Sequence, residues 1–305
     1  MRVLVAVLVA CVLVVPSGGI APGERREAAA AGNMRAAGCG GAALRVADGA
    51  RPGVERNELT PLQAAGVERE LDGLTRRLPP GQRRTGKLSV PVYVHVLHDG
   101  RGGPSDAAVK RQIAALNAAY GGRRGGADTG VAFRLVKTTR TRNAAWYRDA
   151  ERYERTFKRQ LRKGGAGTLN LYTAGMADDL LGWSSFPWQY RSEPVLDGVV
   201  IHEGTLPGGR VRNYDLGFSA VHEIGHWLGL YHTFQDGCAG QGDRVADTPP
   251  QRDPTHGCPG AKDTCRGGGA DPFHNYMDYS HDRCMSEFTS GQAARLRKVW
   301  AAYRA

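Results

Sequence analysis

Hydrophobic residues recur along this chain at two spacings, one typical of helices and one typical of strands. Three segments place apolar side chains three or four positions apart and are predicted helices: 106–120, 149–161 and 289–303. Ser105 and Ser290 are the expected N-caps of the first and the last of these helices. Four shorter segments are rich in β-branched and aromatic residues and are predicted strands: 88–97, 131–138, 168–172 and 197–202.

The N-terminus has a different pattern, which is that of a secretory signal. Arg2 precedes thirteen apolar residues, 3–15, and small residues follow. Such a run is shorter than the roughly 20 residues that cross a bilayer, so it predicts a signal peptide within residues 1–30. Residues 8–11 resemble a lipoprotein cleavage box ending at Cys11, but apolar residues continue beyond it. We therefore expect a secreted protein without a lipid anchor or a transmembrane segment in its mature form.

The formal net charge of +11 is unevenly distributed. Residues 134–163 hold eleven Lys or Arg and three acidic residues, whereas 233–290 hold nine acidic and five basic residues. A basic stripe is typical of nucleic-acid binding, but no helix-turn-helix, zinc-finger or RNP pattern accompanies it here. We interpret the stripe as a solvated, Arg-rich helix and expect no specific nucleic-acid partner. Attraction to anionic cell-surface polymers remains an alternative.

The segment 222–232 reads HEIGHWLGLYH and has the spacing of a zinc site. His222 and His226 are four residues apart, so a helix places both on one face. Gly229 tolerates the positive φ that ends a helix, and the following turn can bring in His232. Three imidazole ligands leave one tetrahedral position for water, which is the arrangement of a catalytic rather than a structural zinc.

Glu223 supplies the second half of this chemistry. Zinc lowers the pKa of a bound water to roughly 7, and a neighbouring carboxylate can take its proton. HExxH alone occurs by chance, but HExxHxxGxxH specifies five positions and is a much stronger signal. The remaining histidines lack ligand spacing and are expected to be structural or exposed: His95, His98, His202, His256, His274 and His281.

A second motif makes the resemblance to one family specific. Residues 274–280 read HNYMDYS, and Met277 is the candidate for the methionine turn that follows HExxHxxGxxH in metzincins. With GDRVADTP (242–249) and CMSEFTSGQAARL (284–296), the chain resembles the pappalysin-type metzincin zinc peptidases, peptidase family M43, in their secreted bacterial form.

This resemblance implies an α/β (α+β) catalytic domain over 87–305. A twisted mixed sheet, a backing helix and the active-site helix would form an upper subdomain, 87–232, above a loop-rich, disulfide-bonded lower subdomain, 233–305. Met277 would form a hydrophobic floor beneath the zinc histidines. Tyr279 would lie close to the metal and stabilise the oxyanion.

Four cysteines cluster after the active-site motif and permit three connectivities. The resemblance favours Cys238–Cys265 and Cys258–Cys284. Each bridge would restrain a glycine-rich loop and contribute about 2–4 kcal/mol.

Residues 31–86 are rich in Ala, Gly and Arg and are interpreted as a removable pro-segment, with Arg83-Arg84 suited to proteolytic trimming. Cys39 lies within it, in the sequence GCGG. A thiolate is a good fourth zinc ligand and would displace the catalytic water. The resemblance therefore implies that Cys39 binds zinc in a latent form, although the Arg of the usual Arg-x-Cys-Gly is missing. The alternative is a free or intermolecularly paired thiol.

The resemblance implies two further sites. LGWSSFPW (181–188) corresponds to an edge strand above the cleft, where Gly182, Trp183 and Ser184 would bind substrate, because a free edge can add an extended peptide. The alternative is a surface loop anchored by its tryptophans. Asp243 and Thr248, with the Val245 carbonyl, would bind a structural Ca²⁺; the alternative there is a turn capped by Asp side chains.

The sequence thus predicts a secreted zinc endopeptidase, made as a latent precursor, that acts on polypeptides. The alternative is a non-catalytic cell-surface or polyanion-binding protein that retains a zinc site. Glu223 argues against it, because a structural site needs no general base. Asp282 and Arg283 are candidates to line the S1′ pocket, but their opposite charges predict opposite preferences. The sequence indicates neither the subsite preference nor the oligomeric state.

Overall fold

The computed structural model describes residues 43–46, 59–80, 86–101, 103–176 and 180–305. The predicted signal peptide, Cys11, Cys39 and the Arg83-Arg84 pair lie outside these ranges. All described elements belong to one compact unit, residues 39–305. Within the described ranges, no helix is both long enough and apolar enough to cross a membrane.

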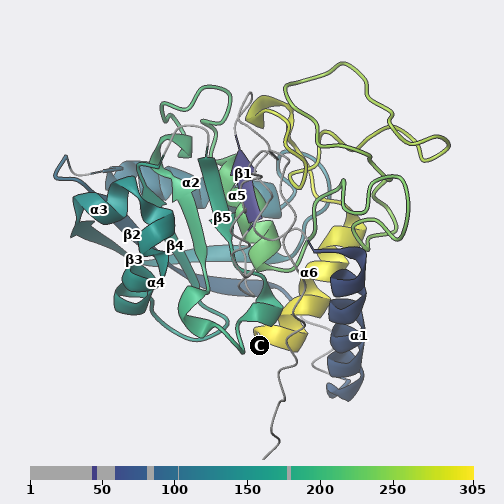
Figure 1. The fold of residues 1–305 in the computed structure, drawn as a ribbon, viewed down its shortest axis with the longest axis horizontal. Helices are drawn as coiled ribbons and strands as arrows, with labels where there is room; N and C mark the ends of the chain where they lie inside the picture. The colour runs from purple at the N-terminus through teal and green to yellow at the C-terminus, as the bar shows by residue number, and fades with distance from the viewer. Residues whose placement is uncertain (1–42, 47–58, 81–85, 102, 177–179) are drawn as a thin grey trace, which may run out of the picture. The chain divides into compact units, whose positions relative to one another are not determined.

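A six-stranded mixed sheet lies at the centre, with the order β1-β5-β6-β4-β2-β3 (Figure 1). Strands β3, β2, β4 and β6 are parallel neighbours, whereas β5 runs antiparallel to both β1 and β6. The strands are β1 Ala43–Val46, β2 Leu88–His98, β3 Val131–Arg142, β4 Leu169–Ala174, β5 Leu180–Ser184 and β6 Val199–His202. The predicted strands are therefore confirmed, with β3 longer than expected.

The two faces of the sheet carry different helices. Helices α2 and α5 cover one face, and α3 and α4 cover the other. The helices are α1 Pro61–Arg77, α2 Asp106–Tyr120, α3 Ala144–Arg148, α4 Ala150–Leu161, α5 Phe218–Trp227 and α6 Ser290–Tyr303. Ser105 caps α2 as predicted, but the N-cap of α6 is Thr289 rather than Ser290. Thr289 has extended backbone angles and forms a capping box with Gln292.

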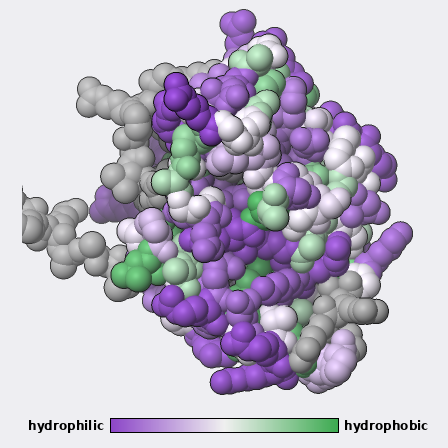
Figure 2. Space-filling model, turned by 90° about the vertical axis from the view of Figure 1, so that its right-hand side faces the viewer, coloured by the Kyte–Doolittle hydropathy of each residue, from purple (hydrophilic) through white to green (hydrophobic). Residues whose placement is uncertain are grey.

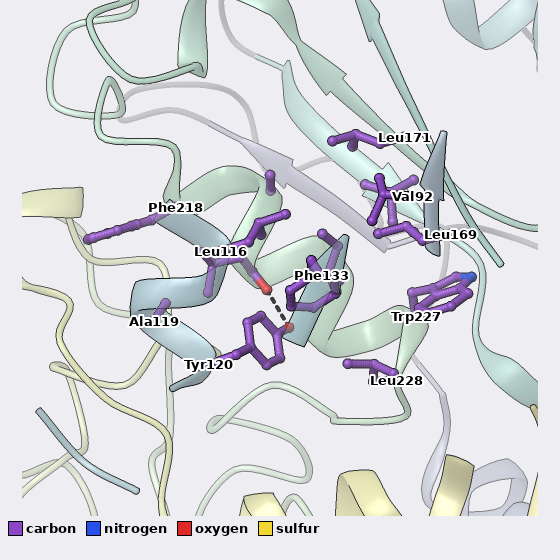
Figure 3. Packing of buried hydrophobic residues seen from close by; sticks show 14 of the residues in the cluster. Val92, Leu116, Ala119, Tyr120, Phe133, Leu169, Leu171, Phe218, Trp227 and Leu228 are labelled. Atoms are coloured by element: carbon purple, nitrogen blue, oxygen red, sulfur yellow. Dashed lines mark hydrogen bonds between the residues drawn. The ribbon is translucent and has the colours of Figure 1, made fainter. Parts of the chain in front are cut away.

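The backing helix α2 is attached to the active-site helix α5 by both packing and a hydrogen bond. Leu116 and Phe133 pack into the same core as Trp227. The Tyr120 hydroxyl donates to the Val221 carbonyl at 3.0 Å, drawn as the dashed line in Figure 3. Burial raises the pKa of Tyr120, so the hydroxyl keeps its proton and remains a donor. Helix α5, which carries the predicted zinc ligands His222 and His226, is therefore fixed against α2.

Residues 233–285 form the loop-rich lower half, and both expected disulfides, Cys238–Cys265 and Cys258–Cys284, are present. Figure 2 looks at the side that carries these loops and α1; this surface is largely hydrophilic, with hydrophobic residues only in small separate groups. Tyr276, Met277 and Phe288 nevertheless join the main core beneath α5. The two halves therefore share one core, and cross-links restrain the outer loops.

Two local features differ from the sequence-based expectation. Helix α1 was not predicted, although Thr60 and Gln63 form a capping box around Pro61, a recognisable helix start. The basic stripe is not solvated throughout. Lys158 on α4 is fully buried, where its ammonium pairs with Glu154 at 2.7 Å and donates to the Leu196 carbonyl. A buried ammonium requires such partners, so this residue belongs to the core.

Candidate active site

Three histidines converge at the C-terminal part of α5. His222 and His226 lie on one face of the helix, and His232 follows the turn after it. The Nε2 atom of His226 lies 3.1 Å from that of His222 and 3.0 Å from that of His232. Gly229 has φ of 99°, as the turn requires. Within the described residues, this is the one group of three His, Cys, Asp or Glu side chains close enough to hold a metal ion.

Backbone carbonyls orient two of these rings. The Nδ1 atoms of His222 and His226 lie 2.7 and 2.8 Å from the carbonyl oxygens of Tyr276 and Leu230. A carbonyl only accepts, so each Nδ1 carries the proton and each Nε2 directs its lone pair inward. Two lone pairs about 3 Å apart repel unless a cation lies between them. The donor set therefore fits zinc, with the orientation that bound metals require.

Burial also favours the neutral ligand form. Desolvation lowers the pKa of His226 to about 4, so its imidazole is uncharged at neutral pH. The ring of Phe186 packs edge-on against it at 5.3 Å, and Phe234 stacks on His232 at 4.6 Å. These apolar walls reduce the local polarity and strengthen electrostatic interactions at the site.

Met277 lies directly under α5, where the methionine turn was predicted. A side chain at Gly225, between the two helical histidines, would collide with the Met277 sulfur. Met277 is fully buried, and its backbone N–H donates to Asn275. The glycine therefore lets a large, polarisable side chain pack against the helix face that carries the ligands.

Tyr279 approaches the site from the same turn. Its hydroxyl lies 3.3 Å from His232 Nε2, and its ring contacts His222 and His232 with centroids 5.5 and 5.1 Å away. The structure thus brings Tyr279 into contact with two of the three histidines, and its role as an oxyanion donor stays a prediction.

Glu223 lies beside the first ligand and is fully buried. Ser184, the last residue of β5, donates its hydroxyl to Glu223 Oε2 at 3.1 Å. A Cβ at Gly182 would lie 2.8 Å from the Val200 carbonyl oxygen and 3.1 Å from Glu223 Cγ, so a side chain there would crowd both β6 and the carboxylate. Sequence reasoning grouped Gly182 and Ser184 as substrate contacts but missed their contact with Glu223.

Trp183 differs from the expectation for a substrate-binding side chain. Its indole is fully buried against α4 and donates to Glu154 at 2.8 Å. Only its backbone lies along the predicted binding edge. That edge is already occupied, because β1 pairs antiparallel with β5 in the register Ala43↔Ser184, Leu44↔Trp183 and Arg45↔Gly182. The expected edge strand is therefore an internal strand in this form of the chain.

Asp282 has a role other than the expected lining of S1′. Its carboxylate is buried and accepts the backbone N–H groups of Leu216 and Phe218 at 2.9 and 3.4 Å. Gly217, the N-cap of α5, has no side chain to perform this task. A distant carboxylate thus caps the active-site helix, whereas Arg283 is exposed. No local sequence pattern indicates this contact.

The candidate calcium ligands also come together. The Thr248 hydroxyl lies 2.7 and 2.8 Å from the two carboxylate oxygens of Asp243 and 2.8 Å from the Val245 carbonyl. Burial raises the pKa of Asp243 to about 7, against the lowering effect of these hydrogen bonds. Asp247 instead accepts from Thr289 and Gly291 at the start of α6.

The other histidines are structural or exposed, as expected. His95 is buried and lies within hydrogen-bond distance of Thr139 and Asn170, and His202 accepts from the Gly204 N–H. His256 and His274 are exposed.

Comparison with known proteins agrees with this geometry. The model of the family Peptidase M43, described as pregnancy-associated plasma protein-A, matches residues 166–301. An extracellular metalloprotease of Uncinocarpus reesii is 46% identical over 225 residues, covering 72% of this chain and 78% of that protein. The chain belongs to peptidase family M43. A second relative, extracellular metalloprotease 1 of Coccidioides posadasii, is 45% identical over 72% of this chain and 79% of its own length.

Two solved structures resemble this peptidase. Mature mirolysin of Tannerella forsythia, in complex with a cleaved peptide, has a TM-score of 0.62 and 32% identity, covering 70% of this chain and 92% of that one. A promirolysin mutant has a TM-score of 0.68 and 29% identity, covering 79% and 88%. The chain is therefore an extracellular zinc metalloendopeptidase with a metzincin-type fold. The expected bacterial origin has no support from the two curated relatives above.

Proposed function

We propose that this peptidase cleaves extended polypeptide segments that pair with β5, with Glu223 as the general base. The observation that carries the proposal is the hydrogen bond between Ser184 and Glu223. It joins β5, whose outer edge would accept a substrate strand once β1 has left it, to a buried carboxylate beside the zinc ligands. A substrate strand added to β5 would therefore present its backbone next to the base.

The chain's own groups divide the chemistry among them. Zinc held by the three histidines would supply Lewis-acid polarisation and lower the pKa of a coordinated water toward about 7. Glu223 takes the proton of the attacking water and returns it to the leaving amine. The Tyr279 hydroxyl is within reach to donate to the oxyanion. Ser184 holds the carboxylate of Glu223 in place through these transfers.

The decisive experiment uses trimmed protein, a peptide library and mass-spectrometric detection of products. Internal cleavage that a zinc chelator abolishes and added zinc restores supports the proposal. Zinc-loaded, folded protein that cleaves no peptide would contradict it. Heparin retention measured in parallel tests the alternative function, which is polyanion binding by the basic stripe at 134–163. Several basic residues of that stripe already pair with acidic residues, such as Arg140 with Asp106 and Arg155 with Glu193.

The precursor is proposed to be latent because β1 occupies the pairing edge of β5. A substrate strand needs the same backbone groups, so β1 must leave before a substrate binds. The likeness to promirolysin supports this proposal. Cys39, four residues before β1 in the sequence, remains the proposed fourth zinc ligand of the latent form. A Cys39→Ala precursor should then show activity before trimming. A silent Cys39→Ala precursor that trimming fully activates would assign latency to β1 alone.

A structural Ca²⁺ at Asp243, Thr248 and the Val245 carbonyl is proposed from their shared geometry. A cation there would favour the ionised carboxylate that burial alone disfavours. Calcium should raise the melting temperature of the wild type but not that of Asp243→Asn. The exposed Asp253→Asn is the control. An equal rise in melting temperature on adding calcium to all three proteins would contradict the proposed site.

A further inference from the structure

Helix α1 contacts the part of the peptidase that carries the third zinc ligand. Ala64 is buried in a cluster with Phe186 and Tyr231, the residue directly before His232. The side chain of Gln235 donates to the Leu59 carbonyl, just before the helix, at 3.0 Å. These contacts connect residues of the predicted pro-segment to both sides of the zinc-binding turn.

Arg295 on α6 links α1 to this turn. Its guanidinium is nearly buried and donates through Nε to the Gly229 carbonyl at 2.9 Å. The guanidinium also lies over the Tyr231 ring at 4.6 Å. Its other two nitrogens donate to the two carboxylate oxygens of Glu68 at 3.1 and 2.6 Å, which is a bidentate pair. The Tyr231 hydroxyl donates to the same carboxylate.

Glu68 is the carboxylate that forms an ion pair with Arg295 in the part of the chain that the structure describes. A buried guanidinium whose partner is removed is left with an uncompensated charge, and this is strongly destabilising. Arg295 holds Gly229 and Tyr231, and these two residues flank the carbonyl of Leu230 that orients His226. A shift of Arg295 would therefore displace the turn that positions His226 and His232.

We propose that α1 is a working part of the active peptidase, in which Glu68 acts as a positioning residue for the zinc-binding turn. The activating cut then lies upstream of Thr60 and removes β1 while α1 stays attached to the chain. This differs from the pro-segment boundary at 86 that the sequence suggested. The inference rests on the latency proposed above. It requires that activation removes β1 from the peptidase and leaves α1 in place.

The contacts of β1 and α1 support this division. Strand β1 uses the backbone edge of β5 that a substrate requires, so activity requires its departure. Helix α1 packs against α6, and its buried residues are Ala64 and Leu71. A cut at Arg83-Arg84 would separate Glu68 from the chain that contains Arg295. A cut before Thr60 would preserve the pair.

The first test is the N-terminus of naturally activated enzyme, determined by intact-mass measurement and N-terminal sequencing. We expect it upstream of Thr60. Two engineered proteins extend the test, with a specific protease site placed either before Leu59 or in place of Arg83-Arg84. After cleavage and removal of the released peptide, zinc affinity is measured by chelator competition. The protein without α1 should bind zinc about tenfold more weakly or worse, on the scale of changes around metal ligands.

The second test isolates Glu68 in the full chain. Glu68→Gln should weaken zinc binding by about tenfold and change the visible spectrum of the cobalt-substituted site, whereas Glu68→Asp should recover part of both. The matched control is Asp72→Asn on the same helix, which breaks the exposed ion pair with Lys298 and should leave both readouts unchanged.

The inference would be overturned by a mature enzyme that begins after Leu78 and contains no bound α1, if its zinc affinity equals that of the longer form. These measurements do not depend on turnover. Loss of all chelator-sensitive cleavage in a form with normal zinc affinity would instead contradict the proposed function. The two failures are therefore distinguishable.

Discussion

The Ser184 hydroxyl donates a 3.1 Å hydrogen bond to Glu223 Oε2, joining the end of β5 to the active-site helix. Ser184→Ala should lower kcat about tenfold with little change in KM, because one hydrogen bond to a charged group contributes about 1.5 kcal/mol or more. Steady-state kinetics on a cleavable peptide measures both constants. Ser192→Ala is the control, since that exposed hydroxyl donates only to the Gln189 carbonyl. An unchanged kcat would show that the contact does not position the base.

Replacing the base itself should have a larger effect. Glu223→Gln preserves the shape of the side chain but cannot accept the proton, so activity should fall about 10²- to 10⁴-fold. Zinc content should stay near one ion per chain, because the three histidines are unaltered. Metal analysis and kinetics on the same preparation test this, with Glu193→Gln as the control, since that half-buried carboxylate pairs with Arg155 and does not contact the histidines. Substantial turnover by zinc-loaded Glu223→Gln would contradict the mechanism.

The contact between Gly225 and Met277 predicts that Gly225→Ala changes the free energy of unfolding in opposite directions in two backgrounds. Alanine at 225 gains about 1 kcal/mol of helix propensity but forces the Met277 sulfur away, and overpacking costs about 1–3 kcal/mol. Gly225→Ala should therefore destabilise the wild type in urea unfolding. In a Met277→Ala background the collision is gone, and the same change should stabilise. The same sign in both backgrounds would show that the two side chains do not compete for space.

Asp282 caps α5 from a distance of 66 residues in the sequence. Asp282→Asn keeps an acceptor oxygen but removes the negative charge at the helix N-terminus, so unfolding free energy should fall by about 1 kcal/mol. Asp282→Ala leaves the half-buried N–H of Leu216 and the buried N–H of Phe218 without this acceptor and should cost more, about 1–3 kcal/mol. Urea unfolding measures both, with the exposed Asp263→Asn as the control. Equal stability of Asp282→Ala and wild type would rule out the cap.

The ion pair of Glu68 with Arg295 predicts a pH dependence. Burial alone would raise the pKa of Glu68, but the hydrogen bonds and charge of Arg295 outweigh it and lower the pKa below 4.5. The folded state therefore binds this proton less tightly than the unfolded state, so the stabilisation is complete above pH 4.5 and is lost as pH falls further. Glu68→Gln should lose about 2 kcal/mol at neutral pH. The difference from wild type should shrink below pH 4.5 in urea titrations; a constant difference would contradict the assignment.

The zinc ligands were predictable because every relation among them is local. Helix periodicity places His222 and His226 together, and Gly229 permits the turn that brings in His232. The helix start at Ser105 likewise depends on a hydrogen bond to a backbone N–H three residues away, whereas the cap of α6 was predicted one residue late, at Ser290 instead of Thr289. These contacts join residues only a few positions apart, so they can be predicted without knowledge of the fold.

The direction of side chains on the strands was harder to predict from the sequence. The segment around Trp183 correctly indicated β5, yet the indole faces α4 and is not part of the binding edge. A strand points alternate side chains to opposite faces, so its contacts depend on which face the neighbouring helix covers. The pairing of β1 with β5 depends in the same way on the order of the sheet.

The amino-acid sequence by itself determined the three-histidine ligand set, the candidate general base Glu223 and the main helices and strands. The tertiary structure alone decided that Ser184 holds Glu223, that Asp282 caps α5 and that Glu68 neutralises Arg295. These pairs are 39, 66 and 227 residues apart, counting the cap from Leu216. Isolated polar residues carry no periodic signal, and their partners are selected only when packing brings distant segments together and burial penalises every polar group left unpaired.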